Sequence, residues 1–238
     1  MKHKSTLKEI EERFDKDVAR FSNMETGQAT TLDATYNMEL IAAGISNVYP
    51  QLEKVLDIGC GAGNYDIKLL QYYAALDFTL VDLSLPMLEK AKERVDEINI
   101  GGKVSVLKGD FRTVELPECH YDVIMATAVL HHLRDDADWE NTFKKLYTWL
   151  KPGGSIWIFD LVHQANADLQ ALIYNEKYGQ YLTGLKDEEY RDHVFAYIEK
   201  EDTPRSLIYQ LDLLKKVGFA NVDILHKNLC FASFVAFK

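Results

Sequence analysis

A glycine-rich segment carries the clearest chemistry in this sequence. It reads Asp57-Ile58-Gly59-Cys60-Gly61-Ala62-Gly63-Asn64, with three glycines at alternate positions. Glycines at the turn between a strand and a helix permit positive φ angles and let a ligand approach the backbone closely. The helix that follows adds free N–H groups at its N-terminus. A tight turn alone requires fewer glycines, so we predict a ligand-binding loop.

Two common nucleotide-binding patterns do not fit this loop. The dinucleotide fingerprint Gly-x-Gly-x-x-Gly matches Gly59 and Gly61 but requires a glycine where Asn64 stands. A phosphate loop would require Gly-Lys-Ser or Gly-Lys-Thr, which the segment lacks. The carboxylate of Asp57 at the loop entrance suits a cationic ligand with an amino group better than a pyrophosphate.

Two further carboxylates follow predicted strands. Asp82 ends a strand 23 residues after Gly59, and Asp110 follows the next strand along the chain. The two oxygens of a carboxylate can accept hydrogen bonds from two neighbouring hydroxyls. Structural roles stay open for both residues, because an acid also stabilises a helix N-terminus and aspartate is frequent in turns.

Histidines and an aspartate supply candidate acid–base groups. His131 and His132 follow the fourth predicted strand, and Asp160 and His163 lie at the end of the fifth. Histidine titrates near neutral pH and can act as a general base, although a structural role in these loops stays open. We predict no metal site, because the cysteines Cys60, Cys119 and Cys230 lie too far apart for a zinc knuckle. Cys60 is interpreted as a small loop residue rather than a reactive thiol.

The elements around these residues alternate between strands and helices. The predicted strands are 55–58, 78–82, 104–107, 121–126 and 155–160, and the predicted helices between them are 65–73, 86–98 and 139–150. Ser84 is the expected N-cap of the second helix. Such alternation indicates right-handed crossovers and a parallel sheet covered on both faces, a Rossmann-like doubly wound α/β fold. Ligands bind such sheets at the carboxyl ends of the strands.

The flanks of this core are expected to be mostly helical. Thr6 and Glu9 form a capping box before a helix, and a second helix is predicted over 31–48. An insertion over 163–200 follows the fifth strand, and strands at 222–226 and 230–237 form an antiparallel hairpin turning at Lys227-Asn228. We expect a single domain, 1–238, with a helical lid (1–50), a core (53–160), a substrate insertion (163–200) and a C-terminal helix and hairpin (201–238).

Composition limits the classes of function. The 238 residues carry a formal charge of −10 and 47% hydrophobic residues, which suits one soluble domain. A nucleic-acid-binding face usually requires a basic surplus, so direct nucleic-acid binding is not expected. The segment Met1-Lys2-His3-Lys4 begins no signal peptide, and no apolar run is long enough to cross a membrane. We expect a cytoplasmic protein, and exposed edge strands would permit a homodimer.

The order of these motifs resembles class I S-adenosylmethionine (SAM)-dependent methyltransferases. The acid-led glycine loop, the acid after the second strand, Gly109-Asp110-Phe111 and Lys151-Pro152-Gly153-Gly154 occur in that family's order over residues 53–160. The resemblance implies that SAM is the cofactor, that Asp82 binds its ribose hydroxyls and that Asp110 accepts from its adenine amino group. The residues it implies at the cofactor are Asp57, Gly59, Cys60, Gly61, Gly63, Asp82, Leu83, Asp110, Phe111 and Ala126.

The flanks resemble one branch, the carboxy-SAM synthase family. The segments 14–19, 214–219 and 231–238 carry this resemblance. Members of that family convert SAM and prephenate into carboxy-SAM, which serves tRNA wobble-uridine modification. Their glycine loop usually lacks the third glycine, and an arginine in the late insertion holds the added carboxylate. Arg191 and Arg205 are the candidates here, but neither matches well, so methyl transfer to a small molecule or modified nucleoside is the favoured function.

The lid and the insertion are expected to contact the ligands. Phe14, Arg20 and Phe21 are predicted to approach the cofactor. Six aromatic residues of the insertion either line an acceptor pocket or form a helix core, and their spacing of three to five residues fits both interpretations. They are Tyr174, Tyr178, Tyr181, Tyr190, Phe195 and Tyr197.

Overall fold

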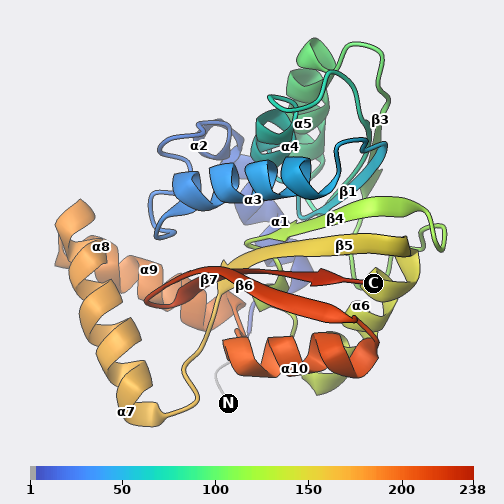
Figure 1. Cartoon of the computed structure of the whole chain (residues 1–238). Coiled ribbons are helices and arrows are strands. Elements are labelled where there is room, and N and C mark those ends of the chain that lie inside the picture. Colours follow the sequence, from blue (N-terminus) through green and yellow to red (C-terminus); the bar gives the residue numbers. More distant parts are fainter. Residues whose placement is uncertain (1–3) are drawn as a thin grey trace.

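A seven-stranded sheet forms the centre of the molecule in a computed structural model that describes residues 4–238 (Figure 1). The strand order across the sheet is β3-β2-β1-β4-β5-β7-β6. The strands are β1 (Lys54–Ile58), β2 (Asp77–Asp82), β3 (Val104–Lys108), β4 (Tyr121–Thr127), β5 (Leu150–Leu161), β6 (Asn221–Asn228) and β7 (Phe231–Phe237). The first five strands pair in parallel, and β7 runs antiparallel to both β5 and β6. The predicted Rossmann-like fold with an antiparallel C-terminal hairpin is confirmed.

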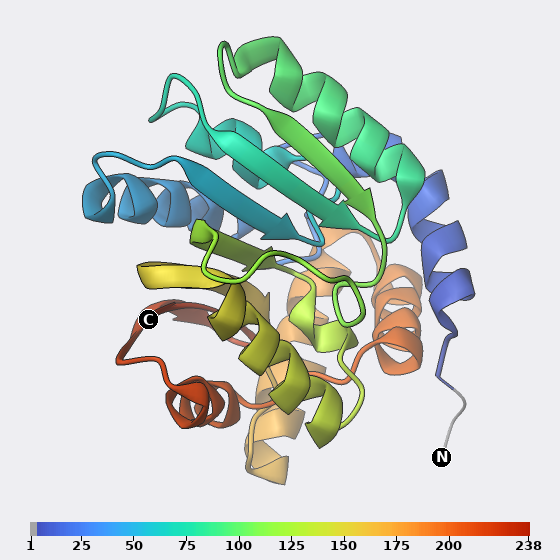
Figure 2. The same ribbon diagram turned by 90° about the vertical axis from the view of Figure 1, so that its right-hand side faces the viewer.

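Helices cover both faces of this sheet (Figures 1 and 2). Three of them, α3 (Ala34–Val48), α4 (Asn64–Leu69) and α5 (Leu85–Ile98), contribute to one hydrophobic core. On the opposite face, α6 (Asp136–Trp149) and α10 (Leu207–Val217) contribute to the other. The inner strands β1, β4 and β7 are buried along almost their whole length because helices cover both of their faces, whereas the edge strands β3 and β6 are partly exposed.

The N-terminal segment forms two helices. These are α1 (Leu7–Lys16) and the short α2 (Val18–Phe21). The predicted capping box is present, since Thr6 Oγ1 accepts from the Glu9 N–H while a Glu9 carboxylate oxygen accepts from the Thr6 N–H at 2.8 Å. Figure 2 shows α1 at the outer side of the fold beside the ends of β2 and β3. This position brings the N-terminal helix close to the edge where a doubly wound sheet binds ligands.

The insertion after β5 is almost entirely helical. It contains α7 (Ala167–Gln170), the π-helix η2 (Ala171–Tyr178), α8 (Gly179–Leu185) and α9 (Glu188–Glu201). In Figure 1 these helices lie beyond one end of the sheet. Tyr178, Leu182, Val194 and Ile198 belong to the same buried cluster as α3, which holds the insertion against the body of the protein.

Two local predictions differ from the structure. The hairpin was expected to turn at Lys227-Asn228, but β6 continues to Asn228 and the turn occupies Leu229 and Cys230, with Leu229 at a φ of 48°. Lys227 and Asn228 instead pair with Ala232 and Phe231 of β7. The fifth strand begins at Leu150 rather than Ser155, so Lys151-Pro152-Gly153-Gly154 lies at the start of β5 rather than before it.

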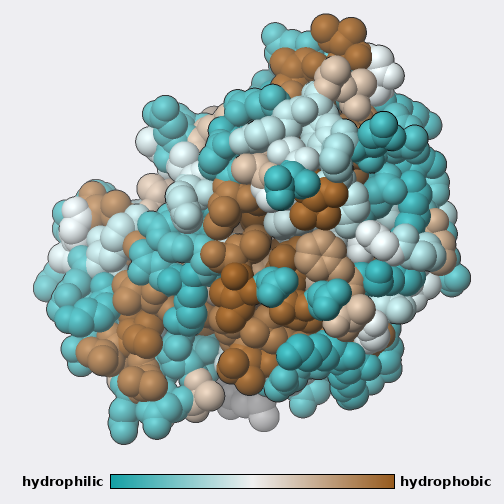
Figure 3. All heavy atoms as spheres, viewed as in Figure 1, coloured by the Kyte–Doolittle hydropathy of each residue, from teal (hydrophilic) through white to brown (hydrophobic). Residues whose placement is uncertain are grey.

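Figure 3 shows hydrophobic residues gathered on the face where β6 and β7 lie in this view. The large apolar residues exposed on α7, η2, α8, α10 and β6 are Leu169, Leu172, Leu185, Ile208 and Ile224. Among the described residues, no helix combines the length and hydropathy that a membrane span requires.

Candidate functional site

The glycine loop lies in the wall of a cleft at the carboxyl ends of β1, β2 and β4. We call it the loop cleft; its empty space is about 990 Å³, including the open solvent at its mouth. The sequence-predicted residues among those lining it are Gly59, Cys60, Gly61, Asp82, Leu83, Asp110, Phe111 and His132. These residues come from four separate stretches of the chain, which the parallel sheet brings to one edge.

Two positions of the loop require glycine for different structural reasons. Gly61 has a φ of 52°, and a Cβ there would meet no atom within 4 Å, because the residue borders the open cleft. Gly63 has a φ of 78°, and a Cβ would lie 3.2 Å from side-chain atoms of Ala91 and Val95 on α5. Gly63 does not line the cleft. The lack of a side chain at this position allows the loop to pack closely against α5 and is not needed for direct contact with a ligand.

Asp82 fixes the loop from the end of β2. Its Oδ2 accepts from the Gly61 N–H at 2.9 Å, and its Oδ1 accepts from the Ser84 N–H at 2.8 Å. Burial raises the pKa of Asp82, while these backbone N–H groups lower it. The carboxylate therefore has a fixed orientation in the cleft wall and retains lone pairs for a further donor.

A second carboxylate lies beneath the loop. Asp57 is 1% exposed and lies against Asp66, a second fully buried acid, and apart from this neighbour its carboxyl oxygens have no hydrogen-bond partner among the described residues. Burial and the nearby charges of Asp66 and Asp82 raise its pKa well above the usual value. Asp57 does not line the cleft directly, and neither does Ala126, which is fully buried in β4. An unpaired buried acid is costly unless a cation or hydrogen-bond donor satisfies it.

Asp110 already has a strong partner. The Arg112 guanidinium bonds both of its oxygens, with Nε 2.9 Å and Nη2 2.7 Å from Oδ2. Arg112 also reaches Asp138 at 3.0 Å. Sequence reasoning gave Asp110 an adenine amino group as its donor and missed this arginine, which lines the same cleft. Asp110 could still accept a hydrogen bond from an adenine amino group, but only through the lone pairs that Arg112 does not use.

Cys60 lines the cleft as a neutral thiol. The residue is buried, and burial together with the neighbouring carboxylates raises the pKa of its thiol. A raised pKa disfavours the thiolate, which is the reactive form of cysteine. This agrees with its interpretation as a small loop residue.

The N-terminal helices close over the cleft. Phe14 and Phe21 line it, as do Leu7 and Ile10 on the apolar face of α1. Asn64 Nδ2 donates to the Phe21 carbonyl at 2.8 Å, and Ser84 Oγ donates to Asp15 Oδ1 at 2.6 Å. The segment expected to form a lid is therefore hydrogen-bonded to the start of α4 and to the N-cap of α5.

A second cleft adjoins the first on the side of the insertion. We call it the insertion cleft; Phe14, Phe21, Gln28, Ala128 and His132 line both clefts. The other residues of its lining include Arg13, Arg20, His131, Asp160, Tyr178, Tyr197, Asp202 and Phe231. Tyr178 and Tyr197 thus face a cavity, whereas Tyr174, Tyr181, Tyr190 and Phe195 pack against the core. Tyr178 and Tyr197 also pack in the core cluster, so the core interpretation applies to all six aromatic residues, and the acceptor pocket stays a prediction for these two.

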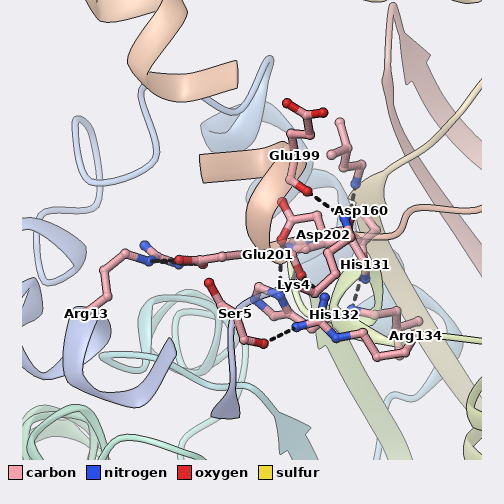
Figure 4. A network of polar contacts seen from close by, with 12 residues as sticks. Lys4, Ser5, Arg13, His131, His132, Arg134, Asp160, Glu199, Glu201 and Asp202 are labelled. Atoms are coloured by element: carbon pink, nitrogen blue, oxygen red, sulfur yellow. Dashed lines mark hydrogen bonds and ion pairs between the residues drawn. The ribbon is translucent and has the colours of Figure 1, made fainter. Parts of the chain in front are cut away.

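A polar network lies where the two clefts meet (Figure 4). His131 Nδ1 hydrogen-bonds Asp160 Oδ1, and His131 Nε2 lies 3.8 Å from Asp202 Oδ1. His132 Nδ1 lies 3.1 Å from the same Asp202 oxygen. Burial would lower the pKa of His131, but the charges of Asp160 and Asp202 outweigh it and raise the pKa to about 9. Burial would raise the pKa of Asp202, but His131 and His132 lower it overall.

Three other predicted residues lie outside both clefts. His163 is exposed after β5, and its backbone bridges to Ser206. Arg191 pairs with Asp192 and Glu188 on the surface of α9, and Arg205 pairs with Asp136. His163 therefore lies apart from Asp160, which lines the insertion cleft, and the catalytic role predicted for His163 has no support from its position. Neither arginine is placed to hold a ligand carboxylate.

Sequence reasoning missed several residues that line the clefts. Asp202 is the most consequential, and it lies 70 positions beyond His132 in the chain. Arg13, Arg112 and Arg134 were missed as well. No local motif distinguishes them, because they come from α1, from the loops after β3 and β4 and from the end of α9, which only the fold brings together.

The architecture matches known methyltransferases. Residues 55–154 match the family described as Methyltransferase domain. A malonyl-[acyl-carrier protein] O-methyltransferase of Priestia megaterium is 33% identical over 139 residues, covering 58% of this chain and 48% of that protein. The chain thus spans about half the length of that relative.

A carboxy-S-adenosyl-L-methionine synthase of Nautilia profundicola aligns along its whole length. It is 24% identical over 249 aligned residues, covering 100% of both chains. Among solved structures, a putative O-methyltransferase from Nostoc punctiforme superposes with a TM-score of 0.62 at 23% identity, covering 84% of this chain and 55% of that one. That superposition supports the fold.

Proposed function

We propose that the chain is a class I SAM-dependent methyltransferase, which transfers the methyl group of SAM to a small-molecule or modified-nucleoside acceptor. The observation that carries this proposal is the pair of joined clefts. One is walled by the glycine loop and the strand-end carboxylates, and the other by the insertion. His132 and four other residues border both.

The loop cleft fits SAM on three grounds. Gly61 leaves an open space where a Cβ would otherwise project. Asp57 and Asp66 form a pair of buried acids beneath the loop, and a cationic ligand above the loop would favour the ionised form of Asp57. Asp82 is fixed by two backbone N–H groups with lone pairs left over, which suits the ribose hydroxyls.

The protein contributes mainly by positioning. SAM supplies an electrophilic methyl group on its sulfonium. Phe14 and Phe21 cover the junction of the clefts and exclude water from it, which strengthens the electrostatic interactions inside. Holding the reactants in a near-attack arrangement is worth several orders of magnitude in rate. The polar network of His131, His132, Asp160 and Asp202 is the group of residues that would contact the acceptor.

The insertion cleft indicates the kind of acceptor. Aromatic rings of Phe14, Tyr178, Tyr197 and Phe231 line it, and charged groups of both signs stand among them. An acceptor with a ring or apolar body and one polar functional group matches that lining. The cleft is enclosed by the lid and the insertion, which favours a small molecule over a macromolecular surface.

Product analysis tests this proposal. The purified protein would be incubated with methyl-labelled SAM and a panel of phenols, carboxylates, amines and nucleosides, and labelled products would be identified by mass spectrometry. Methylation of at least one class, abolished when Asp82 is replaced by Ala, is the expected result. Binding of SAM without methylation of any class would overturn the acceptor part of the proposal.

Carboxy-SAM synthesis is a second candidate function. The alignment with the Nautilia synthase over both whole chains favours it. Arg13 and Arg20 line the insertion cleft, although Arg13 is paired with Glu201 and Arg20 with Asp17. Incubation with SAM and prephenate separates the two functions, because a synthase yields a sulfonium heavier than SAM by one carboxyl group. The favoured function predicts unchanged SAM under these conditions.

A cytoplasmic location and the absence of direct nucleic-acid contact remain part of the proposal. The net charge of −10 supports the second point.

A homodimer would be formed through the apolar face around β6, where Ile224 is 52% exposed on the edge strand. Size-exclusion chromatography with light scattering tests it.

A further inference from the structure

Three side chains at the junction of the clefts present ligand atoms to one point. They are His131, His132 and Asp202, and their ligand atoms all lie within 4.8 Å of one another. Asp202 Oδ1 lies 3.1 Å from His132 Nδ1 and 3.8 Å from His131 Nε2. A divalent ion bound at 2.0–2.2 Å in tetrahedral geometry holds its ligand atoms roughly 3.4 Å apart. The two distances from Asp202 Oδ1 lie on either side of that value.

Two of these atoms have no hydrogen-bond partner among the described residues other than each other. His132 Nδ1 and Asp202 Oδ1 are both buried and face each other at 3.1 Å, with an angle that is poor for a hydrogen bond. The Asp202 side chain is only 5% exposed. Buried polar atoms without a partner require an explanation, and an ion between them is one. An ion bonded to the lone pairs of both atoms would satisfy them together.

The orientation of His131 adds an independent argument. Its Nδ1 hydrogen-bonds Asp160, which leaves Nε2 directed toward Asp202. Asp160 is itself held by the N–H groups of Leu130 and Leu161, each at 2.7 Å from one of its oxygens. Histidines that bind metals almost always donate their other ring N–H to a carboxylate or carbonyl, which fixes the ring. His131 and Asp160 have that arrangement.

The arginines nearest to Asp202 make their hydrogen bonds to other groups in the described part of the chain. Arg13 donates to the Glu201 carboxylate, and Arg134 donates to the carbonyls of Glu201 and Ser5. Lys4 donates to the backbone carbonyl of Asp202 (Figure 4). An ion would displace the proton from His131 Nε2, and the carboxylates of Asp202 and Asp160 would then balance one divalent charge.

We propose that His131, His132 and Asp202 bind a divalent transition-metal ion of the Zn²⁺ class, with Asp160 orienting His131. Three protein ligands leave one coordination position open, as in catalytic zinc sites. All three residues line the insertion cleft, so the open position faces the space assigned to the acceptor. An oxygen or nitrogen atom of the acceptor would complete the site. This last step rests on the proposed function, whereas metal binding itself does not.

Cobalt binding tests the site directly. The full chain would be treated with a chelator, exchanged into metal-free buffer and titrated with Co²⁺, whose visible absorption reports tetrahedral nitrogen and oxygen ligands. We expect one equivalent of Co²⁺ to bind, to be displaced by Zn²⁺, and to give a metal:protein ratio of one by elemental analysis. Absence of stoichiometric binding would overturn the proposal and leave the network as a hydrogen-bonded ion cluster.

Matched variants identify the ligands. Asp202→Asn and His132→Gln should each weaken Co²⁺ binding at least 100-fold, and Asp160→Asn should weaken it about tenfold, as outer-shell partners do. His163→Gln is the control, because His163 is exposed outside both clefts. The affinity of this variant for Co²⁺ should equal that of the wild type. Binding that survives Asp202→Asn would contradict the assignment. Thermal melts would confirm that each variant is folded, and SAM affinity on the same samples would separate failure of this inference from failure of the proposed function.

Discussion

The guanidinium of Arg13 on α1 and the carboxylate of Glu201 at the end of α9 form a paired contact. Nη2 of Arg13 lies 2.6 Å from Oε2 of Glu201, and Nε lies 2.9 Å from Oε1. The Glu201 side chain is 7% exposed. This pair joins the N-terminal lid to the insertion, so the two segments that cover the clefts are linked to each other as well as to the core.

Breaking this link should weaken the closed state. Arg13→Gln leaves the buried Glu201 carboxylate without its paired charge, and such losses are strongly destabilising locally. We expect SAM to dissociate about tenfold faster with a smaller change in association rate, measured by stopped-flow fluorescence. Arg191→Gln, which breaks only surface pairs on α9, is the control. Equal SAM dissociation rates in wild type and Arg13→Gln would show that the lid does not retain the ligand.

Asp82 should be required for SAM binding. Asp82→Ala removes the acceptor of the Gly61 and Ser84 N–H groups and the expected partner of the ribose. Hydrogen bonds to a charged group are worth about 1.5–3 kcal/mol each, so the SAM dissociation constant should rise at least tenfold by calorimetry. Asp77→Asn, at the opposite end of β2, should leave it unchanged. A dissociation constant within twofold of wild type for Asp82→Ala would remove this residue from the cofactor site.

The two glycines of the loop should respond differently to alanine. Gly61→Ala places a methyl group in the open cleft, so the affinity for SAM should fall sharply. The free energy of unfolding should fall only by roughly 1–2 kcal/mol, which is the cost of placing a residue with a Cβ in the left-handed conformation. Gly63→Ala adds a contact at 3.2 Å with Ala91 and Val95, so its loss of stability should exceed that of Gly61→Ala. Urea unfolding and SAM titration of both variants measure the two effects. The reverse order of stabilities would contradict this division of roles.

Asp66 should make stability depend on pH. Burial raises the pKa of Asp66 from its ordinary range to about 7. The folded state therefore binds this proton more tightly than the unfolded state, and the stability owed to this group falls as pH rises from about 4 to 7. Asp66→Asn removes the titrating group. We therefore expect the melting temperature of the variant minus that of the wild type to be larger at about pH 8 than at about pH 5. The exposed Glu189→Gln serves as control, and a difference that does not change with pH would contradict the raised pKa.

Local sequence signals predicted much of the fold. Thr6 with Glu9 and Ser84 indicated the helix starts that α1 and α5 show. These signals depend on residues three positions apart, so no tertiary context is needed to read them. The hairpin turn was misplaced because Lys227 and Asn228 have turn-like character, whereas the register against β7 extends β6 through both of them.

Residues that directly follow the predicted strands were the ones that could be found from the sequence. Gly59, Gly61, Asp82 and Asp110 line the loop cleft, and His131, His132 and Asp160 line the insertion cleft. Asp202 could not be predicted, since its approach to His132 results from the path of the insertion rather than from spacing in the sequence. Arg112 is two residues from Asp110, yet its pairing with that carboxylate depends on side-chain conformation, which the pattern does not encode.

Native mass spectrometry of the full chain with and without added SAM tests the central claim most directly. The account predicts a one-to-one complex with SAM, or with its demethylated product as purified, and loss of that complex in Asp82→Ala. A protein that stays empty at SAM concentrations that saturate related enzymes would contradict the claim that the loop cleft is a SAM site.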